Sequence, residues 1–363
     1  MVRGRPNVPL APLTTLGLGG PAHRVFELTD NAQLTGIAQE LDDDLAGMAV
    51  EPVPIGGGSN VVVADDGVTA PAILLRTRGV TYRPQPGDSR VTVTIQAGHP
   101  WQEVLEELTA EGLVGMETMT GIPGTVGAMP VQNVGAYGQE TADTLVSVLA
   151  WDWQQHRAVT LDAAACQLGH RRSRFKDTHR WLILSVTFTV TRGVLSTPIT
   201  YRQVADALDA PLGSRAPVGE VIGAIRTVRA SKGMLLPEAG PDARTVGSVF
   251  LSSPIDHARA SALRARGAPV HDFPDGSTRV SASWLIREAG FDLGQPVAPG
   301  VRVSTRHYTL VADDGATTAT FVEATRRVQD RVVDATGVLL TPEPDPVGEL
   351  PAYLRLLDRR PCR

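Results

Sequence analysis

Residues 121–140 read GIPGTVGAMPVQNVGAYGQE, a segment with five glycines, two prolines and a single charged residue. This composition suits neither a helix nor a regular strand. Because glycine lacks a Cβ and adopts positive φ, such a segment can fold tightly and bring main-chain N–H groups close to a ligand. Residues 55–60, IGGGSN, have the same character. Either loop alone is typical of a surface turn, whereas the two together predict backbone cradles around one large phosphorylated cofactor.

Length and composition predict a soluble enzyme of two domains. The chain has 363 residues, of which 42% are hydrophobic and 20% are charged, and one hydrophobic core rarely serves so long a chain. No apolar stretch approaches the ~20 residues of a membrane span. The first residues, MVRGRPNVPLAPL, lack the apolar core of a secretion signal. We therefore expect a cytoplasmic protein without membrane insertion.

Charge and cysteine content argue against two further classes of site. The net charge is −5 and charges of both signs are interspersed, so no basic surface for nucleic acid is indicated. The two cysteines, Cys166 and Cys362, lie in no CxxC or Cys/His pattern. We therefore expect neither a disulfide framework nor a bound metal.

Lysine and asparagine are scarce. Only two of the 34 basic residues are lysines, Lys176 and Lys232, and two of the four asparagines, Asn60 and Asn133, lie in the glycine-rich loops. A site that needs a compact ammonium ion does not accept the planar guanidinium of arginine. The two lysines are therefore either functional residues, or positions that remained lysine by chance in a chain that otherwise uses arginine.

Hydrophobic periodicity predicts mixed helices and strands, with helices dominating beyond Thr191. Strands are expected at 22–28, 52–55, 61–63, 72–75, 91–95, 145–151 and 182–190. Helices are expected after Asp30 or Asn31, from Pro100 to Gly112, and at 218–228, 283–289 and 320–335. This change from mixed elements to mainly helices predicts that a second domain begins near residue 195.

One glycine pattern imitates a dinucleotide-binding fingerprint. Residues 17–22, GLGGPA, fit GxGxxA, but an extended segment follows where a helix would be required. We therefore discount it. The GGGSN loop lies between two predicted strands, so its grip on phosphate would come from successive loop N–H groups.

Seven motifs in order carry a resemblance to a known family: IGGGSNVVV, GIPGTVGAMPVQNVGAYGQE, RRSRFK, RASKGM, VGSVF, WLIREAGF and LLTPEP. Over residues 14–345 the chain resembles the UDP-N-acetylenolpyruvoylglucosamine reductases, flavoenzymes of peptidoglycan synthesis. The resemblance implies an α+β protein with a vanillyl-alcohol-oxidase-type FAD-binding domain of two subdomains at 14–194. A smaller C-terminal α+β substrate-binding domain would occupy 195–345, and 346–363 would form a peripheral tail.

The implied reaction is reduction of the enolpyruvyl group of a UDP-sugar, with NADPH as hydride donor and non-covalent FAD as carrier. Ser248 aligns with the proton donor of the family, a weak acid that must be held against a basic intermediate. Arg171 aligns with the arginine that meets the substrate carboxylate. Glu343 aligns with the acid on the other side of that carboxylate and would function best protonated. The implied protein is a monomer or a weak homo-oligomer.

The resemblance also assigns residues to the two ligands. Tyr201 and Lys232 match residues that contact the pyrophosphate of the UDP-sugar, and Glu288 occupies a substrate-site position where the family often has glutamine. The residues implied for FAD come from both loops: Gly56, Gly57, Gly58, Ser59, Asn60, Gly121, Pro123, Gly124, Thr125, Gly127, Asn133, Gly135, Ala136 and Tyr137.

Several positions depart from the family pattern. Val246 and Val249 stand where alanine and phenylalanine are usual, and His170 replaces a tyrosine before Arg171. Two other functions therefore stay open. One is an FAD-dependent oxidase of the same superfamily that uses oxygen. The other is a divergent paralogue with altered specificity, or a sugar-nucleotide sensor that has lost turnover.

Overall fold

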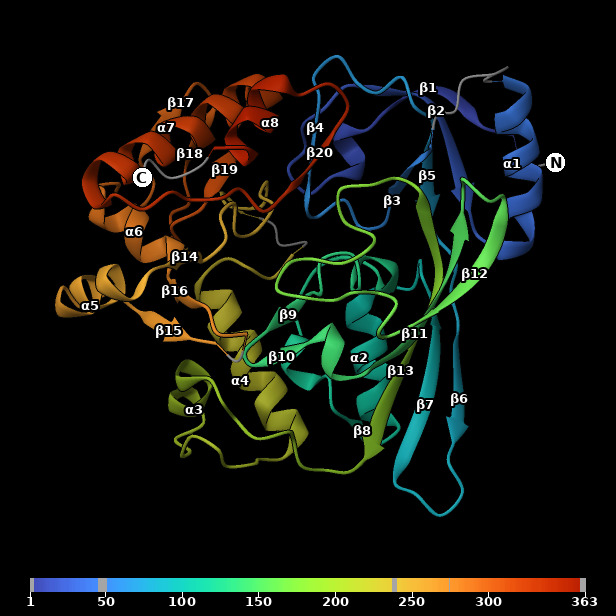
Figure 1. The fold of residues 1–363 in the computed structure, drawn as a ribbon, viewed down its shortest axis with the longest axis horizontal. Coiled ribbons are helices and arrows are strands. Elements are labelled where there is room, and N and C mark those ends of the chain that lie inside the picture. Colours follow the sequence, from blue (N-terminus) through green and yellow to red (C-terminus); the bar gives the residue numbers. More distant parts are fainter. Residues whose placement is uncertain (1–2, 45–50, 237–239, 274, 360–363) are drawn as a thin grey trace. The chain divides into compact units, whose positions relative to one another are not determined.

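The larger of the two compact units of the chain contains a four-stranded sheet and a six-stranded antiparallel sheet (Figure 1). The structure is a computed structural model, and it describes residues 3–44, 51–236, 240–273 and 275–359. The chain divides into two compact units, the first at 1–8, 22–57 and 70–236 and the second at 9–21, 58–69 and 237–363.

The first sheet of unit 1 has the order β1-β2-β5-β3, with bounds Arg5–Pro9, Pro21–Leu28, Ala72–Leu75 and Val53–Ile55. The strands β2, β5 and β3 are parallel, and parallel strands need a crossover connection. Helix α1 (Leu34–Asp44) supplies it between β2 and β3. Asp30 and Gln33 form a capping box just before α1, which confirms the predicted helix start.

The second sheet of unit 1 is antiparallel and has the order β12-β11-β13-β7-β6, with β8 paired to β13. The bounds are β6 Val80–Pro84, β7 Arg90–Gln96, β8 Leu113–Val114, β11 Leu145–Asp152, β12 Arg157–Asp162 and β13 Trp181–Arg192. Buried and partly exposed residues alternate along β7, as a half-buried strand requires. Helix α2 (Trp101–Ala110) is confirmed too, with its apolar stripe buried.

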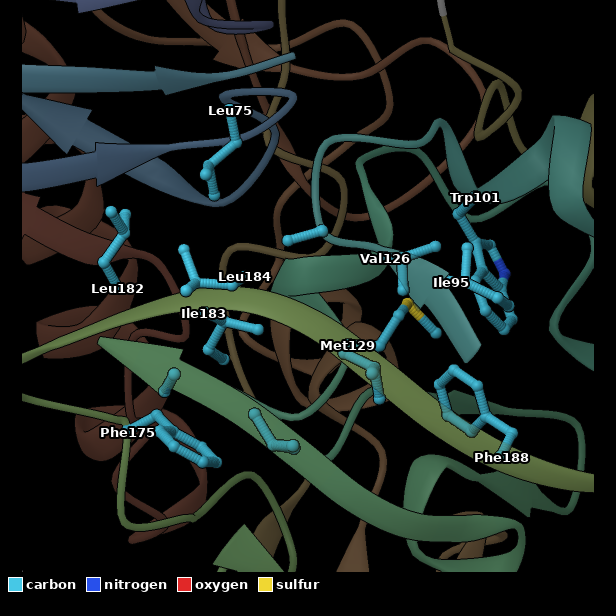
Figure 2. Close-up of a cluster of buried hydrophobic side chains, with 14 of the residues drawn as sticks. Leu75, Ile95, Trp101, Val126, Met129, Phe175, Leu182, Ile183, Leu184 and Phe188 are labelled. Atoms are coloured by element: carbon cyan, nitrogen blue, oxygen red, sulfur yellow. The ribbon is translucent and has the colours of Figure 1, made fainter. Parts of the chain in front are cut away.

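Part of the glycine-rich segment 121–140 belongs to the core of unit 1 (Figure 2). Val126 and Met129, which are 0% and 2% exposed, lie among Ile95, Trp101 and Phe188. The rings of Trp101 and Phe188 are 6.2 Å apart. Burial of side chains of this size contributes about 1.5–3 kcal/mol each. The apolar residues between the glycines therefore anchor the loop, while the glycines shape it.

Residues 195–236 carry two helices, α3 (Arg202–Ala207) and α4 (Val218–Ser231), and belong to unit 1. The division of the structure therefore does not coincide with the domain boundary predicted near residue 195. Thr197 explains part of this, because its N–H and its hydroxyl both donate to the buried carboxylate of Glu117, at 2.6 and 2.9 Å. The assignment of binding roles to domains at 14–194 and 195–345 stays a prediction.

The described residues of unit 2 form three small sheets. The strands β4 (Val61–Val63) and β20 (Asp345–Val347) are parallel, and the other two sheets have the orders β14-β16-β15 and β17-β18-β19. Their bounds are β14 Ser253–Ile255, β15 Val270–Asp272, β16 Thr278–Val280, β17 Pro296–Ala298, β18 Val301–Val303 and β19 Leu310–Ala312.

The helices of unit 2 are α5 His257–Ala265, α6 Ala282–Glu288, α7 Thr318–Thr336 and α8 Pro351–Leu357. Helix α5 packs on β15 and β16, whereas α6 and α8 pack on α7. Helix α7 packs along β17, β18 and β19 (Figure 1). It begins with a capping box between Thr317 and Thr320 and ends at Gly337, whose φ of 67° is the left-handed cap that glycine favours. Among the described residues, no helix is long and apolar enough to cross a lipid bilayer.

The tail predicted to be peripheral is in part a component of the unit 2 core. Tyr353 and Leu356 of α8 are 0% and 4% exposed and join the same hydrophobic cluster as α7. The Tyr353 hydroxyl donates to the carbonyl of Pro344 at 3.0 Å. The prediction rested on the prolines of this segment, but Pro351 opens the helix at its first turn, where proline is tolerated.

Candidate functional site

The two glycine-rich loops approach each other closely through residues predicted to bind the cofactor. A Cβ added to Gly57 would lie 2.7 Å from the Cα of Gly124, and one added to Gly56 would meet the hydroxyl of Thr125. Both pairs lie within unit 1. The division between units passes after Gly57, and in unit 2 Gly58 has a φ of 61° and leaves no room for a side chain beside Leu13. Gly57 and Gly58 are therefore required by close packing of main chain on main chain, and Gly56 by the approach of the Thr125 side chain.

The loop at 121–140 ends in a tight β-hairpin. Strands β9 (Gly135–Ala136) and β10 (Gln139–Glu140) pair antiparallel. The two residues between them, Tyr137 and Gly138, have φ values of 50° and 91°. Positive φ at both positions is the mark of a type I′ turn. Tyr137 is therefore presented at a hairpin tip, a finding that the glycine count alone did not predict.

Two buried polar groups in this loop have no hydrogen-bond partner within the described part of the chain. They are the hydroxyl of Thr125, a residue 6% exposed, and the side-chain Nδ2 of Asn133, a residue 0% exposed. Buried polar groups are almost always paired. These two groups lie in a loop whose glycines leave the main chain accessible. Such an unpaired hydroxyl and amide donor suit a polar ligand, such as the diphosphate and ribityl portions of FAD. The residues present therefore suit the predicted cofactor.

Arg171 contacts this same loop. Its guanidinium donates to the carbonyls of Asn133 and Gly135, at 3.3 Å each. Arg171 has a φ of 50°, in a turn closed by the bridge between Gly169 and Arg172. The structure thus brings the predicted carboxylate-binding arginine to the predicted cofactor loop.

Ser173 fixes the RRSRFK segment onto the glycine-rich loop. Its hydroxyl donates to the carbonyl of Val131 at 2.6 Å and accepts the N–H groups of Phe175 and Lys176, at 2.9 and 3.2 Å. Phe175 is buried in the core of unit 1. Lys176 is therefore held by its main chain in the arginine-bearing segment, and no ligand role follows from this placement.

The predicted pyrophosphate-binding residues lie near the hairpin tip. The rings of Tyr137 and Tyr201 are 5.2 Å apart and nearly perpendicular. Lys232 closes α4 and donates from Nζ to Oε1 of Gln203 at 2.7 Å. Partial burial, and then the nearby cation of Arg229, lower the pKa of Lys232. Like-charge repulsion of this kind makes an anionic ligand favourable at the lysine.

Arg229 is a candidate that sequence reasoning missed. It is 7% exposed, and it donates from Nε to the carbonyl of Gly121 at 3.0 Å and from an Nη atom to the carbonyl of Met234 at 2.9 Å. Its cation also lies close enough to the Tyr137 hydroxyl to influence that group electrostatically. Arg229 therefore ties the start of the glycine-rich loop to α4. The sequence spacing could have revealed this burial. Arg229 falls four residues after the buried Ile225 and therefore lies on the apolar face of α4.

Ser248 and Glu343 are brought together within unit 2. The N–H of Glu343 donates to the carbonyl of Val249 at 2.8 Å, and the N–H of Leu251 donates to the carbonyl of Thr341 at 3.0 Å. The segments that carry the two predicted catalytic groups are therefore adjacent strands of main chain. Because Arg171 belongs to unit 1, the meeting of all three groups stays a prediction.

Glu288 is the last residue of α6 and is held by arginines. Its carboxylate lies 3.3 Å from Arg266 and 3.6 Å from Arg287. These partners offset the negative charge that the departure from glutamine introduces. Its role in substrate binding stays a prediction.

Comparisons with known proteins extend over nearly the whole chain. Residues 30–161 match the family described as FAD binding domain, and residues 240–347 match the UDP-N-acetylenolpyruvoylglucosamine reductase C-terminal domain. A UDP-N-acetylenolpyruvoylglucosamine reductase of Salinispora arenicola (strain CNS-205) is 39% identical, covering 92% of this chain and 93% of its own. One of Thermobifida fusca (strain YX) is 38% identical, covering 94% and 97%.

A solved structure gives the same result for the fold. The crystal structure of UDP-N-acetylenolpyruvylglucosamine reductase from Thermus caldophilus matches with a TM-score of 0.65 at 21% identity, and the match covers 96% of this chain and 100% of that one. Together with the sequence identities, this likeness confirms the predicted family and the α+β fold. The chain therefore belongs to the UDP-N-acetylenolpyruvoylglucosamine reductase family, and it carries that family's C-terminal domain behind an FAD-binding domain.

Proposed function

We propose that this protein reduces the enolpyruvyl group of UDP-N-acetylenolpyruvoylglucosamine to give UDP-N-acetylmuramate, with NADPH as hydride donor and FAD as the bound carrier. Family membership supports the activity. The observation in the structure that carries the proposal is the contact of Arg171 with the carbonyls of Asn133 and Gly135. It attaches the proposed substrate-binding cation to the loop that suits the cofactor.

Bound FAD would supply the transfer of a hydride from NADPH to the substrate. The chain supplies charge, orientation and a proton. Arg171 would bind the substrate carboxylate, because a permanently charged guanidinium stabilises negative charge that grows there during the reaction. Glu343, in its protonated form, would donate a hydrogen bond to the same carboxylate. Ser248 would donate its hydroxyl proton to the neighbouring carbon and recover a proton from solvent afterwards.

The nucleotide portion of the substrate would be held in unit 1. Tyr201 and Lys232 provide a phenol hydroxyl and an ammonium ion for the diphosphate. Burial raises the pKa of the Tyr137 hydroxyl, although the Arg229 cation opposes this shift, so the phenol beside them stays a hydrogen-bond donor at neutral pH. Glu288, which belongs to unit 2 and is paired with arginines, would also contribute to substrate binding.

The cellular setting is part of the proposal. UDP-sugars and NADPH are solutes of the cell interior, which supports a cytoplasmic enzyme. We propose that it acts as a monomer or a weak homo-oligomer. Its product would feed peptidoglycan synthesis, and through the cell wall it would affect cell shape and division.

An anaerobic titration tests this function. The purified protein should be yellow, NADPH should bleach the flavin absorbance, and the enolpyruvyl UDP-sugar should restore it. Ser248→Ala should keep the bleaching step and lose the restoring step, because only the second step needs a proton donor. Colourless protein that cannot be reconstituted with FAD would refute the proposal.

The same titration separates the alternatives. Recovery of colour only with oxygen, with release of peroxide, would identify an oxidase. Binding of the UDP-sugar without recovery of colour would identify a sensor that has lost turnover. Unchanged turnover in Ser248→Ala would remove that residue from the mechanism.

A further inference from the structure

The direction of the Ser248 hydroxyl depends on its main chain. The residue is partly exposed, and its side chain makes no hydrogen bond within the described part of the chain. On either side, Val246 and Val249 are 7% and 1% exposed and belong to the unit 2 core. Gly247 has a φ of 75°, in the left-handed region that glycine adopts without strain. Whatever fixes the peptide groups at 247–249 therefore aims the serine.

Thr309 binds both of these peptide groups. Its hydroxyl donates to the carbonyl of Gly247 and accepts the N–H of Val249, the latter at 3.2 Å. These two groups belong to the peptide that precedes Ser248 and to the peptide that follows it. A hydroxyl has one proton to donate and lone pairs to accept with, so a single threonine satisfies both contacts at once.

The threonine is itself held in place. Thr309 is 7% exposed, its N–H donates to the carbonyl of His307 at 2.9 Å, and its carbonyl accepts the N–H of Ser304 at 2.9 Å. Its branched Cβ restricts rotation about χ1. The Oγ1 atom therefore has little freedom to follow the serine segment if that segment moves.

The contact also reaches the second group proposed for proton chemistry. The carbonyl of Val249 accepts the N–H of Glu343 at 2.8 Å. A rotation at Val249 would displace Glu343 as well as Ser248. The Thr309 hydroxyl thus binds the main chain that carries both groups, and Thr245 adds a hydrogen bond to the N–H of Gly247, before the serine.

We propose that Thr309 is a positioning residue for proton donation by Ser248. Its hydroxyl fixes the peptide groups on both sides of the serine and so sets the direction in which the serine proton points. This inference rests on the proposed function, since it assumes that Ser248 delivers the proton.

Thr309→Val is the direct test, because valine keeps the shape of threonine and loses both hydrogen bonds. A displacement of a reacting group by ~1 Å costs up to about 100-fold in rate. We expect recovery of flavin absorbance with the UDP-sugar to slow by about 10- to 100-fold. Bleaching by NADPH should be unchanged, because it uses no proton from Ser248. The solvent deuterium isotope effect on recovery should rise, and Thr309→Ser should regain most of the rate.

Thr325→Val is the matched control. Thr325 is 0% exposed in α7 of the same unit, and its hydroxyl donates to the carbonyl of Phe321 at 2.8 Å. This variant also removes a buried hydroxyl, but far along the chain from the Ser248 segment. We expect it to lose stability towards urea while both flavin steps keep their rates.

The outcomes separate the inference from the function on which it rests. If wild type turns over, Ser248→Ala blocks recovery, and Thr309→Val recovers as fast as Thr325→Val, the inference is overturned and the function stands. If Thr309→Val slows both flavin steps equally, the threonine has only a structural role and the inference is again overturned. If wild type shows no recovery with the UDP-sugar, the proposed function itself has failed.

Discussion

Replacement of Asp242 by asparagine should destabilise unit 2 strongly and in a pH-dependent way. The Asp242 side chain is 2% exposed and accepts hydrogen bonds from Arg302, Ser304 and Thr305, at 2.7 to 3.3 Å. Burial alone would raise its pKa. The hydrogen bonds from Thr305, Arg302 and Ser304 together outweigh burial and lower the pKa from 3.8 to about 2.

The size of the effect follows from this shift. A drop from 3.8 to about 2 corresponds to about 2 kcal/mol of stability carried by the ionised carboxylate. Because the folded-state pKa is the lower one, this stability is fully present above the unfolded-state pKa and is lost as pH falls from about 5 towards 2. In Asp242→Asn, the amide N–H groups would face the hydrogen-bond donors that the carboxylate accepts from, and Arg302 would lose an anionic partner. The total loss of unfolding free energy at pH 7 should therefore be about 3–5 kcal/mol.

Glu323→Gln provides a matched comparison. Glu323 has a pKa that is also lowered to about 2, by hydrogen bonds from Arg326 and Arg327, but its side chain is 36% exposed on helix α7. Solvent screens such pairs, so the cost should stay below about 1 kcal/mol and vanish in about 1 M salt.

The assay is urea denaturation followed by circular dichroism, at pH 7 and at pH 3, with and without salt. Asp242→Asn should lower the midpoint sharply at pH 7, resist salt, and differ less from wild type at pH 3. Equal losses in the two variants at pH 7, or a loss in Asp242→Asn that salt abolishes, would refute the argument that burial makes the difference between these carboxylates.

Two further predictions concern the cofactor loop and the buried thiol. Gly57→Ala should lower the affinity for flavin by about 5- to 150-fold, measured as the flavin bound per protein. The added Cβ would lie 2.7 Å from the Cα of Gly124, and overpacking of this kind costs about 1–3 kcal/mol. Gly223→Ala, whose Cβ would meet nothing within 4 Å, should keep its flavin, and equal flavin loss in both would contradict the packing argument. Burial raises the pKa of Cys166 from 9.0 to about 11, so in a Cys362→Ser background its alkylation in native protein should be about 100-fold slower than after denaturation. Rapid modification of the native thiol would show that the site is open.

Hydrophobic periodicity predicted those helices and strands in which buried residues recur at regular spacing. The strand at 91–95 and the helices at 101–110 and 318–336 each place one apolar face on a core, and that face is visible in the sequence. The glycine-rich loop was also predictable. A segment with repeated glycines and without helix or strand periodicity indicates a loop.

Contacts between polar side chains and distant main chain were not predictable in this way. Nothing in the spacing shows that Glu117 accepts from Thr197, and the expected boundary near 195 therefore misses the attachment of 195–236 to unit 1. The same holds for Arg229 on Gly121 and for Thr309 around Ser248. Each is a single hydrogen-bonding group whose partner lies far away along the chain, and periodicity carries no information about such partners.

The parallel pairing of β4 with β20 has a consequence for how the protein is made. Val61–Val63 cannot pair until Asp345–Val347 are made. That strand leaves the ribosome about 280 residues later, or roughly 15–60 s at usual translation speeds. Until then the nascent chain exposes an apolar strand with unsatisfied main-chain groups on the side that β20 will cover. Unit 2 therefore cannot complete its fold until β20 has been synthesised, and until then its early apolar segments are exposed to aggregation.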